Sequence, residues 1–254
     1  MWSQKKSKSL KTVLYYFYKL FGELDVVAIA KKRGIKIDWI LEAGCHDGSD
    51  SVILYENFKP ERYLAFEPDE NARTQAELAF KLSKVETIEL HPFGLSNVNA
   101  KKYLKYEAEG KGSGSTHFAD TGEDVVEIRV FDDHFTVHQQ SGLLWLDVEG
   151  HTLQALDGMA VSLQQIVIAR VEVQLHTRNK DFFQDFLEVT QVMLKASLVP
   201  VYGPIYPGYF GDIIFVDSNL LKTKDKVRSK FLWLLMKFLH LHFYPKINKP
   251  SVTK

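Results

Sequence analysis

Apolar and polar residues follow one another along this chain in short blocks that predict strands and helices in turn. A short apolar run between turn residues predicts a buried strand, and apolar positions three or four residues apart predict a helix. The expected strands cover residues 39–41, 62–66, 85–90, 125–131, 143–147, 166–173 and 212–216, and residues 198–202 are also extended. The expected helices cover residues 11–32, 49–57, 71–82, 152–156 and 182–195. This alternation predicts an α/β protein with a mostly parallel central sheet and helices on both faces.

The middle of the chain is less regular. Residues 100–106 alternate like an exposed strand or one arm of a hairpin. Residues 107–124 are glycine-rich, polar and too long for a simple turn, so they are interpreted either as a lid on the substrate side or as an insertion. Asp132 and Asp133 are typical of the N-cap of a short helix, which we expect to end near Gly142.

The most informative segment links the first expected strand to the next helix. Residues 40–50 read Ile-Leu-Glu-Ala-Gly-Cys-His-Asp-Gly-Ser-Asp, in which Gly44 and Gly48 permit a tight turn close to a ligand. Glu67 ends the second expected strand, nineteen residues after Gly48. In a βαβ unit this acid lies beside the first loop, where a carboxylate can accept two hydrogen bonds from ribose hydroxyls.

The charge of this loop indicates which nucleotide cofactor it suits. A dinucleotide loop needs three glycines near a pyrophosphate, whereas this loop has two glycines flanked by Glu42 and Asp47. Acids repel phosphate, so they favour a ligand with an ammonium, a sulfonium and a ribose, which describes S-adenosylmethionine. The alternative is a structural glycine turn capped by Asp47, with Glu67 as a solvated strand end.

Length and composition limit the class of protein. The chain has 254 residues, of which 45% are hydrophobic, enough for one α/β domain with appendages. Cys45 is the single cysteine, which excludes an intramolecular disulfide and a cysteine-rich zinc site. We therefore expect a reducing, cytoplasmic environment in which Cys45 packs as a small buried residue.

Charge is strongly segregated, although the net charge is zero. Residues 1–33 carry eight Lys and Arg against two acids, a charge of +6, and residues 222–254 carry nine against one, a charge of +8. Residues 34–221 hold 15 basic and 29 acidic residues, a charge of −14. We expect a basic helical N-terminal segment at 1–36, an acidic catalytic body at 37–218 and a basic helical tail at 219–254.

Both basic ends contain aromatic apolar runs, at residues 13–21 and 231–244. Each run is shorter than the roughly 20 residues that span a bilayer, so no transmembrane helix is predicted. Residues 22–25, Gly-Glu-Leu-Asp, offer no cleavage site, so no signal peptide is expected. One interpretation is peripheral contact with anionic lipid through the lysines. The other is packing on the sheet or on another subunit in an oligomer.

Acidic residues also end the later strands. Asp147 ends the strand at 143–147, and Glu149 would point to the same side as Asp147 if the strand continued. Glu172 lies near the end of the strand at 166–173, and His176 follows shortly after it. Ligands bind beyond the carboxyl ends of parallel strands, so these residues are expected to converge and act on a substrate hydroxyl as base and positioning groups. In a second version, Asp147 and Glu172 hold a Mg²⁺-like ion. A structural alternative is that Glu149 caps the next helix and Asp147 satisfies backbone amides.

The residues resemble the FkbM-type S-adenosylmethionine-dependent methyltransferases over about 39–216. The motifs that carry the resemblance are Leu41–Gly48, Ala65–Pro68, Gly94–Asn97, Val130–Asp133, Leu146–Gly150 and Leu156–Gly158. The resemblance implies a Rossmann-like class I methyltransferase fold, for which we expect an antiparallel last strand, and O-methylation, often of sugars. It places these residues at the cofactor: Glu42, Gly44, Cys45, Asp47, Gly48, Glu67, Pro68, Phe93 and Ser96. The family often has an acid at the position of Thr152, which leaves a role there open.

These observations predict an O-methyltransferase acting on a hydroxyl of a sugar, glycan or glycolipid precursor. No nucleic-acid partner is expected, because an acidic body is a poor surface for phosphates. An RNA methyltransferase that uses its basic ends is the enzymatic alternative. A non-catalytic, membrane-associated scaffold that retains a cofactor pocket is the alternative from another class.

Overall fold

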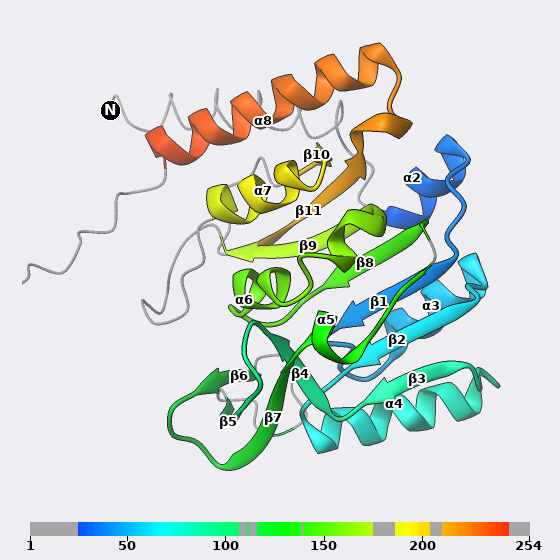
Figure 1. The fold of residues 1–254 in the computed structure, drawn as a ribbon, viewed down its shortest axis with the longest axis vertical. Coiled ribbons are helices and arrows are strands. Elements are labelled where there is room, and N and C mark those ends of the chain that lie inside the picture. The colour runs from blue at the N-terminus through cyan, green and yellow to red at the C-terminus, as the bar shows by residue number, and fades with distance from the viewer. Residues whose placement is uncertain are drawn as a thin grey trace, which may run out of the picture.

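A computed structural model describes residues 25–106, 111, 116–138, 140–174, 186–203 and 210–243. Its main element is a seven-stranded sheet of order β10-β11-β9-β8-β1-β2-β3 (Figure 1). The strands are β1 Trp39–Ala43, β2 Arg62–Phe66, β3 Ile88–His91, β8 Gly142–Leu146, β9 Ile166–Gln174, β10 Leu198–Tyr202 and β11 Phe210–Asp217. Strands β3, β2, β1, β8 and β9 pair in parallel, whereas β11 is antiparallel to both of its neighbours. The mostly parallel sheet with an antiparallel last strand is confirmed.

Helices cover both faces of this sheet (Figure 1). The helices are α2 Val26–Arg33, α3 Ser49–Phe58, α4 Glu70–Leu82, α5 Phe131–His134, α6 Thr152–Asp157, α7 Phe186–Lys195 and α8 Thr223–Phe243. Within β1, Trp39 and Leu41 belong to one buried cluster with α6, α7 and α8, while Ile40 belongs to another with α2, α3 and α4. Successive strand residues point to opposite faces, so the fully apolar start of β1 follows from burial on both sides.

A second, four-stranded sheet lies beside the carboxyl ends of β1 and β2 (Figure 1) and was not predicted. Its order is β4-β7-β5-β6, with β4 Phe93–Ser96, β5 Ala100–Tyr106, β6 Thr116–Ala119 and β7 Asp124–Val130. The expected strand at 85–90 begins only at Ile88, and the expected loop at 107–124 contains β6. Strands β5, β6 and β7 are mostly half-buried or exposed, so their apolar pattern is weak, whereas β4 is buried but has only four residues.

The expected helix that follows Asp132 is a single turn, α5, and ends at His134 rather than near Gly142. Val130 is its N-cap residue. The Asp132 carboxylate instead accepts hydrogen bonds from the Val161 amide at 2.7 Å and from the Ser162 hydroxyl at 2.6 Å. The prediction was wrong because this acid caps a turn that is remote in sequence rather than its own helix.

An ion pair links the end of α2 to the start of α8. Asp25 is the N-cap residue of α2, and Gly34, with a φ of 65°, is its C-cap residue. Arg33 forms an ion pair with Asp225 of α8 at 2.9 Å. The proposed division at residues 36/37 and 218/219 stays a prediction. Within the described residues, none of the helices combines the length and the apolar character that crossing a membrane requires.

Candidate active site

A cleft of about 220 Å³ opens where β1, β2 and β8 end against the small sheet. Its floor is the loop after β1, and Gly94, Leu95, Leu104 and Phe118 of the small sheet contribute to its lining. Seven acids line it, namely Glu42, Asp47, Asp50, Glu67, Asp69, Asp147 and Glu149. No Lys or Arg lies among the described residues of this lining. The predicted cofactor residues Glu42, Gly44, Cys45, Asp47, Glu67 and Pro68 therefore meet in one negatively charged cleft.

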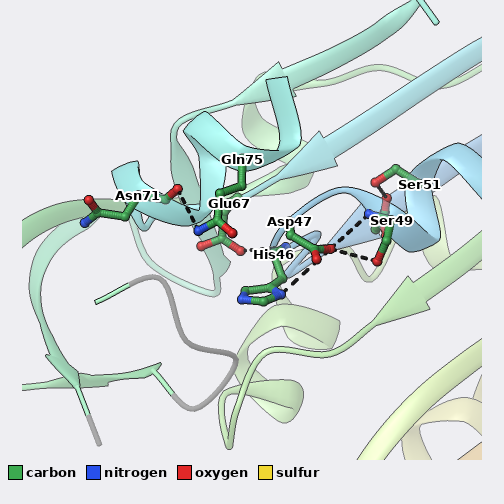
Figure 2. A network of polar contacts seen from close by, with 8 residues as sticks. His46, Asp47, Ser49, Ser51, Glu67, Asn71 and Gln75 are labelled. Atoms are coloured by element: carbon green, nitrogen blue, oxygen red, sulfur yellow. Dashed lines mark hydrogen bonds and ion pairs between the residues drawn. The ribbon is translucent and has the colours of Figure 1, made fainter. Parts of the chain in front are cut away.

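Glu67 follows the last residue of β2 and is 7% exposed. One of its carboxylate oxygens accepts a hydrogen bond from the His46 amide at 3.0 Å, and the other accepts one from the Asp69 amide at 2.9 Å. Figure 2 shows the side chain pointing from its strand toward the His46 loop. Burial raises the pKa of Glu67 to about 7, although these two amide bonds favour the charged form. Glu67 is therefore a buried carboxylate held by two amides, and the alternative interpretation of a solvated strand end was wrong.

Glu42 lies inside β1 and is 1% exposed. One of its carboxylate oxygens, Oε2, accepts hydrogen bonds from the Ser51 hydroxyl at 2.5 Å and the Tyr63 hydroxyl at 2.7 Å. The other oxygen, Oε1, is buried without a hydrogen-bond partner among the described groups. Burial raises the pKa of Glu42 to about 7, against the effect of the two hydroxyls. An orphaned buried acceptor beside a cleft is the arrangement expected where a donor group of a ligand completes the site.

The two glycines of the loop serve packing as well as access to the cleft. A Cβ on Gly44 would lie 1.7 Å from the backbone oxygen of Asp147, and Gly44 has a φ of 81°. A Cβ on Gly48 would lie 2.9 Å from the Ala76 Cα, so this glycine allows α4 to approach the loop. Gly48 does not line the cleft. Gly48 is the N-cap residue of α3 and has a φ of 76°.

Asp47 and Cys45 occupy the loop between these glycines. The Asp47 carboxylate accepts hydrogen bonds from the Ser49 amide at 3.0 Å and the Ser49 hydroxyl at 2.7 Å (Figure 2). Asp47 thus caps the glycine turn, as the structural alternative proposed, while it also lines the cleft. Cys45 is buried, as predicted, and burial raises the pKa of its thiol well above its usual value.

The small sheet changes which residues near β4 face the cleft. Gly94 and Leu95 line it, whereas the predicted Phe93 and Ser96 do not. Phe93 lies in the aromatic core, where its ring is 5.4 Å from that of Phe66. The Ser96 hydroxyl instead lies 3.0 Å from Nε2 of His151. The segment that the resemblance places near adenine therefore lies at the cleft through Gly94 and Leu95, and cofactor contacts of Phe93 and Ser96 stay a prediction.

A second acidic group stands at the β8 side of the cleft. One carboxylate oxygen from each of Asp147, Glu149 and Glu172 lies within 4.8 Å of the other two, and all three side chains are partly buried. Asp147 and Glu172 share a hydrogen bond. Burial and the negative charges of Asp147 and Glu149 raise the pKa of Glu172, which favours its protonated form. The predicted fourth member, His176, lies outside the described residues.

Arg170 lies beside this acidic group, and the sequence analysis did not predict its role. Its guanidinium lies 3.9 Å from Asp147, 2.8 Å from Asp212 and 4.1 Å from the ring centre of Trp145. Burial raises the pKa of Asp147, while the Glu172 hydrogen bond and the Arg170 charge lower it. A proton and a guanidinium therefore relieve the repulsion between the carboxylates.

The turn after β8 brings the acids together in an unexpected way. The strand ends at Leu146, so strand parity does not explain why Asp147 and Glu149 are close. Glu149 has a φ of 44° and Gly150 a φ of 85°. A left-handed backbone at a residue other than glycine costs about 1 kcal/mol or more and is enriched at functional sites. The turn that presents Glu149 is thus locally strained.

The positions after this turn have structural roles in the described residues. His151 lies edge-on to Phe118 at 5.0 Å, and burial lowers its pKa to about 4, so it is neutral at pH 7. Thr152 is buried, and its hydroxyl donates to the Glu172 carbonyl at 3.4 Å. This contact ties the start of α6 to the strand that carries Glu172.

The site residues that were not predicted have only weak signals in the sequence. Tyr63 carries a hydroxyl within a buried strand, and Ser51 is a polar residue inside α3. A buried hydroxyl needs a hydrogen-bond partner, so each residue indicates that a polar group lies nearby. Arg170 is a charge within an apolar strand, which indicates a pairing acid. No comparable signal identifies Phe118, because the small sheet itself was not recognised.

A comparison with models of protein families gives a match, whereas a comparison with curated proteins gives none. The family model described as the methyltransferase FkbM domain matches residues 42–198, which is more than half of the chain. Among proteins with curated functions, none is similar enough in sequence to match.

Solved structures with a similar fold include several methyltransferases. A methyltransferase FkbM from Methylobacillus flagellatus KT has 15% identity and a TM-score of 0.47, over 71% of this chain and 43% of its own. This chain therefore spans less than half the length of that protein. An rRNA methylase from Streptococcus thermophilus has 14% identity and a TM-score of 0.44, over 73% of this chain and 90% of its own. Magnesium protoporphyrin IX methyltransferase from Synechocystis PCC 6803, with bound SAH, has 9% identity and a TM-score of 0.43, over 83% and 82%.

Proposed function

The chain belongs to the FkbM methyltransferase domain family, and we propose that it transfers a methyl group from S-adenosylmethionine to a hydroxyl of a sugar, glycan or glycolipid precursor. The observation that carries this proposal is that the acids of the β1 and β2 loops and those of the β8 turn line one cleft. A cofactor group and an acceptor group can therefore lie side by side. Without that shared cleft, the two acidic groups would be unrelated.

The cofactor half fits a sulfonium nucleoside. Each Glu67 oxygen accepts one amide hydrogen bond and retains a lone pair for a ribose hydroxyl. Glu42 offers a buried oxygen without a partner. Seven lining acids and no Lys or Arg among the described lining residues favour a cation and disfavour a phosphate. When bound, S-adenosylmethionine supplies a methyl group attached to a positively charged sulfur.

The acceptor half fits a neutral hydroxyl. Protonated Glu172 donates a hydrogen bond to Asp147, which fixes the orientation of that carboxylate and leaves Asp147 as the group that accepts the proton of the acceptor hydroxyl. Glu149 supplies a second acceptor at the rim of the cleft. Sugars present several hydroxyl donors, so they suit a surface rich in carboxylates. A nucleic acid would instead bring phosphates toward these charges.

A divalent ion is the other way to use the same acids. Asp147, Glu149 and Glu172 offer carboxylate oxygens at a spacing that could hold Mg²⁺. The Asp147–Glu172 hydrogen bond and the nearby Arg170 favour the version without metal, because they already compensate the charges. The proton version is therefore the one proposed.

A labelled-methyl transfer screen tests the proposal. Full chain and labelled S-adenosylmethionine are incubated with bacterial-type saccharides, glycolipid precursors and RNA, each with and without Mg²⁺. Label on a saccharide or glycolipid hydroxyl supports the proposal. Label on RNA that is lost when both basic ends are removed would replace it by the RNA methyltransferase. Cofactor binding without transfer to any hydroxylated acceptor would replace it by the scaffold.

A further inference from the structure

The short segment of residues 67–69, which carries Glu67, borders two cavities. Pro68 lines the acid-lined cleft, and it also lines a neighbouring groove of about 710 Å³. Residues 67–69 belong to no helix or strand. Pro68 also has no amide hydrogen, so the segment has one backbone donor fewer than usual. A segment of this kind needs contacts from elsewhere to hold one conformation.

Arg73 of α4 supplies such contacts. Its Nη1 donates hydrogen bonds to the Glu67 carbonyl at 2.9 Å and to the Pro68 carbonyl at 3.1 Å. Hydrogen bonds from a charged donor are roughly twice as strong as those between neutral groups. The guanidinium therefore holds two consecutive peptide groups of the segment.

The place of Arg73 in its helix explains this reach. Asp69 is the N-cap residue of α4, and Arg73 is the fourth residue of the helix. Helical side chains lean toward the N-terminus, so a long side chain at this position reaches the residues before the helix. A cation near the N-terminal end of a helix is disfavoured by the helix dipole. The two carbonyl oxygens compensate for that cost, because they carry partial negative charge.

Arg73 also differs from the other arginines in its partners. Four described arginines form an ion pair with a carboxylate, whereas Arg73 has no such pair within the described residues; the four are Arg33, Arg62, Arg129 and Arg170. The contacts of Arg73 with the chain are thus directed at the backbone of residues 67–69.

One peptide group links Arg73 to the Glu67 carboxylate. The Pro68 carbonyl accepts the Arg73 hydrogen bond, and the Asp69 amide of the same planar peptide group donates to Glu67 Oε1 at 2.9 Å. Glu67 and Asp69 are both buried, and hydrogen bonds away from water polarise and strengthen one another. The charge of Arg73 therefore strengthens the amide donor that holds Glu67.

We propose that Arg73 is a positioning residue, which fixes the Glu67 carboxylate for the cofactor ribose through the peptide group between Pro68 and Asp69. This inference rests on the proposed cofactor role of Glu67. Arg73 does not line the cleft, whereas Glu67 does. The loss of Arg73 should therefore weaken cofactor binding by acting on Glu67, while the rest of the cleft lining stays in place.

Calorimetry with S-adenosylhomocysteine on full-length variants tests the proposal. We expect Arg73→Leu to lower the affinity about tenfold, and Arg73→Lys to restore most of it because an ammonium keeps a charged donor. Arg73→Gln keeps a neutral donor and should lose about threefold, so it replaces Arg73→Leu if that variant does not fold. Arg62→Leu is the matched control, since Arg62 donates to the Thr136 carbonyl from the other end of β2. Native affinity in both Arg73→Leu and Arg73→Gln would overturn the proposal.

A double-mutant cycle shows whether Arg73 acts through Glu67. If it does, adding Arg73→Leu to Glu67→Ala should lower the affinity by less than about twofold, because the carboxylate that it positions is already gone. A further tenfold loss in the Glu67→Ala background would mean that Arg73 supports the fold in general, and the proposal would be wrong.

Amide hydrogen exchange of the cofactor-free chain separates this inference from the proposed function. We expect Arg73→Leu to speed exchange of the Asp69 amide about tenfold and to leave unchanged the Val85 amide, which donates to the Phe80 carbonyl beyond the other end of α4. A native chain that binds no S-adenosylhomocysteine, together with this change, would contradict the proposed function but support the hold of Arg73 on Glu67. Unchanged Asp69 exchange would overturn the positioning role itself.

Discussion

Gly44 touches the backbone of Asp147 so closely that a Cβ on the glycine would lie 1.7 Å from the Asp147 carbonyl oxygen. The Asp147 amide also donates to the Ala43 carbonyl at 3.0 Å. The loop after β1 and the turn after β8 are therefore fixed against each other. This contact joins the cofactor half of the cleft to the acceptor half.

The first prediction follows from that contact. In Gly44→Ala the new methyl group would clash with the Asp147 carbonyl oxygen, and alanine would have to adopt a φ of 81°. We expect a loss of about 4 kcal/mol or more in the free energy of unfolding, measured by urea denaturation. Gly34→Ala is the matched control, because Gly34 also has a positive φ but has nothing within 4 Å of a new Cβ. The control should lose only about 1 kcal/mol, and similar losses in both variants would contradict the packing role.

The second prediction concerns the acids after β8. Asp147→Asn removes the group that accepts the acceptor proton, and we expect a fall in kcat of about a hundredfold or more with unchanged binding of S-adenosylhomocysteine. Glu172→Gln keeps a hydrogen-bond donor toward Asp147, so its kcat should fall within about fivefold. Glu188→Gln, an exposed acid on α7, serves as the control. Steady-state methyl transfer and calorimetry provide the two readouts.

The third prediction distinguishes the proton from a metal. Because Glu172 and Arg170 already compensate Asp147, we expect methyl transfer to persist after treatment with a chelator and without added Mg²⁺. Loss of activity with the chelator, restored by Mg²⁺, would instead assign Asp147, Glu149 and Glu172 to an ion. In that case Glu172→Gln should also lose most of the activity, since an amide is a weaker ligand than a carboxylate.

The fourth prediction is a pH dependence of cofactor affinity. Burial raises the pKa of Glu67 and of Glu42 to about 7, and ribose hydroxyls donate to the carboxylate form. Affinity for S-adenosylhomocysteine should therefore rise with pH up to about 7 and level off above it, by roughly tenfold between about pH 6 and about pH 8. Glu67→Gln should remove most of this slope in calorimetric titrations. Affinity that is flat in the native chain, or falls with rising pH, would contradict the assignment.

The sequence allowed prediction of those parts that depend on contiguous residues. The strand at Trp39, the loop with Gly44 and the acid at Glu67 form one βαβ unit, in which spacing along the chain determines position in space. The convergence of Asp147 and Glu172 could also be predicted, because both lie near the carboxyl ends of neighbouring parallel strands.

The remaining features depend on pairings between distant residues. The small sheet pairs β4 with β7, β7 with β5 and β5 with β6, and Gly94 and Leu95 rather than Phe93 and Ser96 line the cleft. Arg170 acquires its role from Asp147 and Asp212, which belong to two other segments. The residues next to Arg170 in the sequence do not identify its acidic partners, although a buried polar residue indicates that a partner exists.

The central claim is that Glu67 in an acid-lined cleft holds the ribose of a sulfonium nucleoside. Calorimetry with S-adenosylhomocysteine on the native chain, Glu67→Ala and the exposed control Glu77→Ala tests it most directly. We expect measurable binding by the native chain and the control, and a binding free energy weaker by roughly 1.5–3 kcal/mol in Glu67→Ala, as for charge-assisted hydrogen bonds. Equal affinity in all three proteins, or no binding by the native chain, would contradict the account.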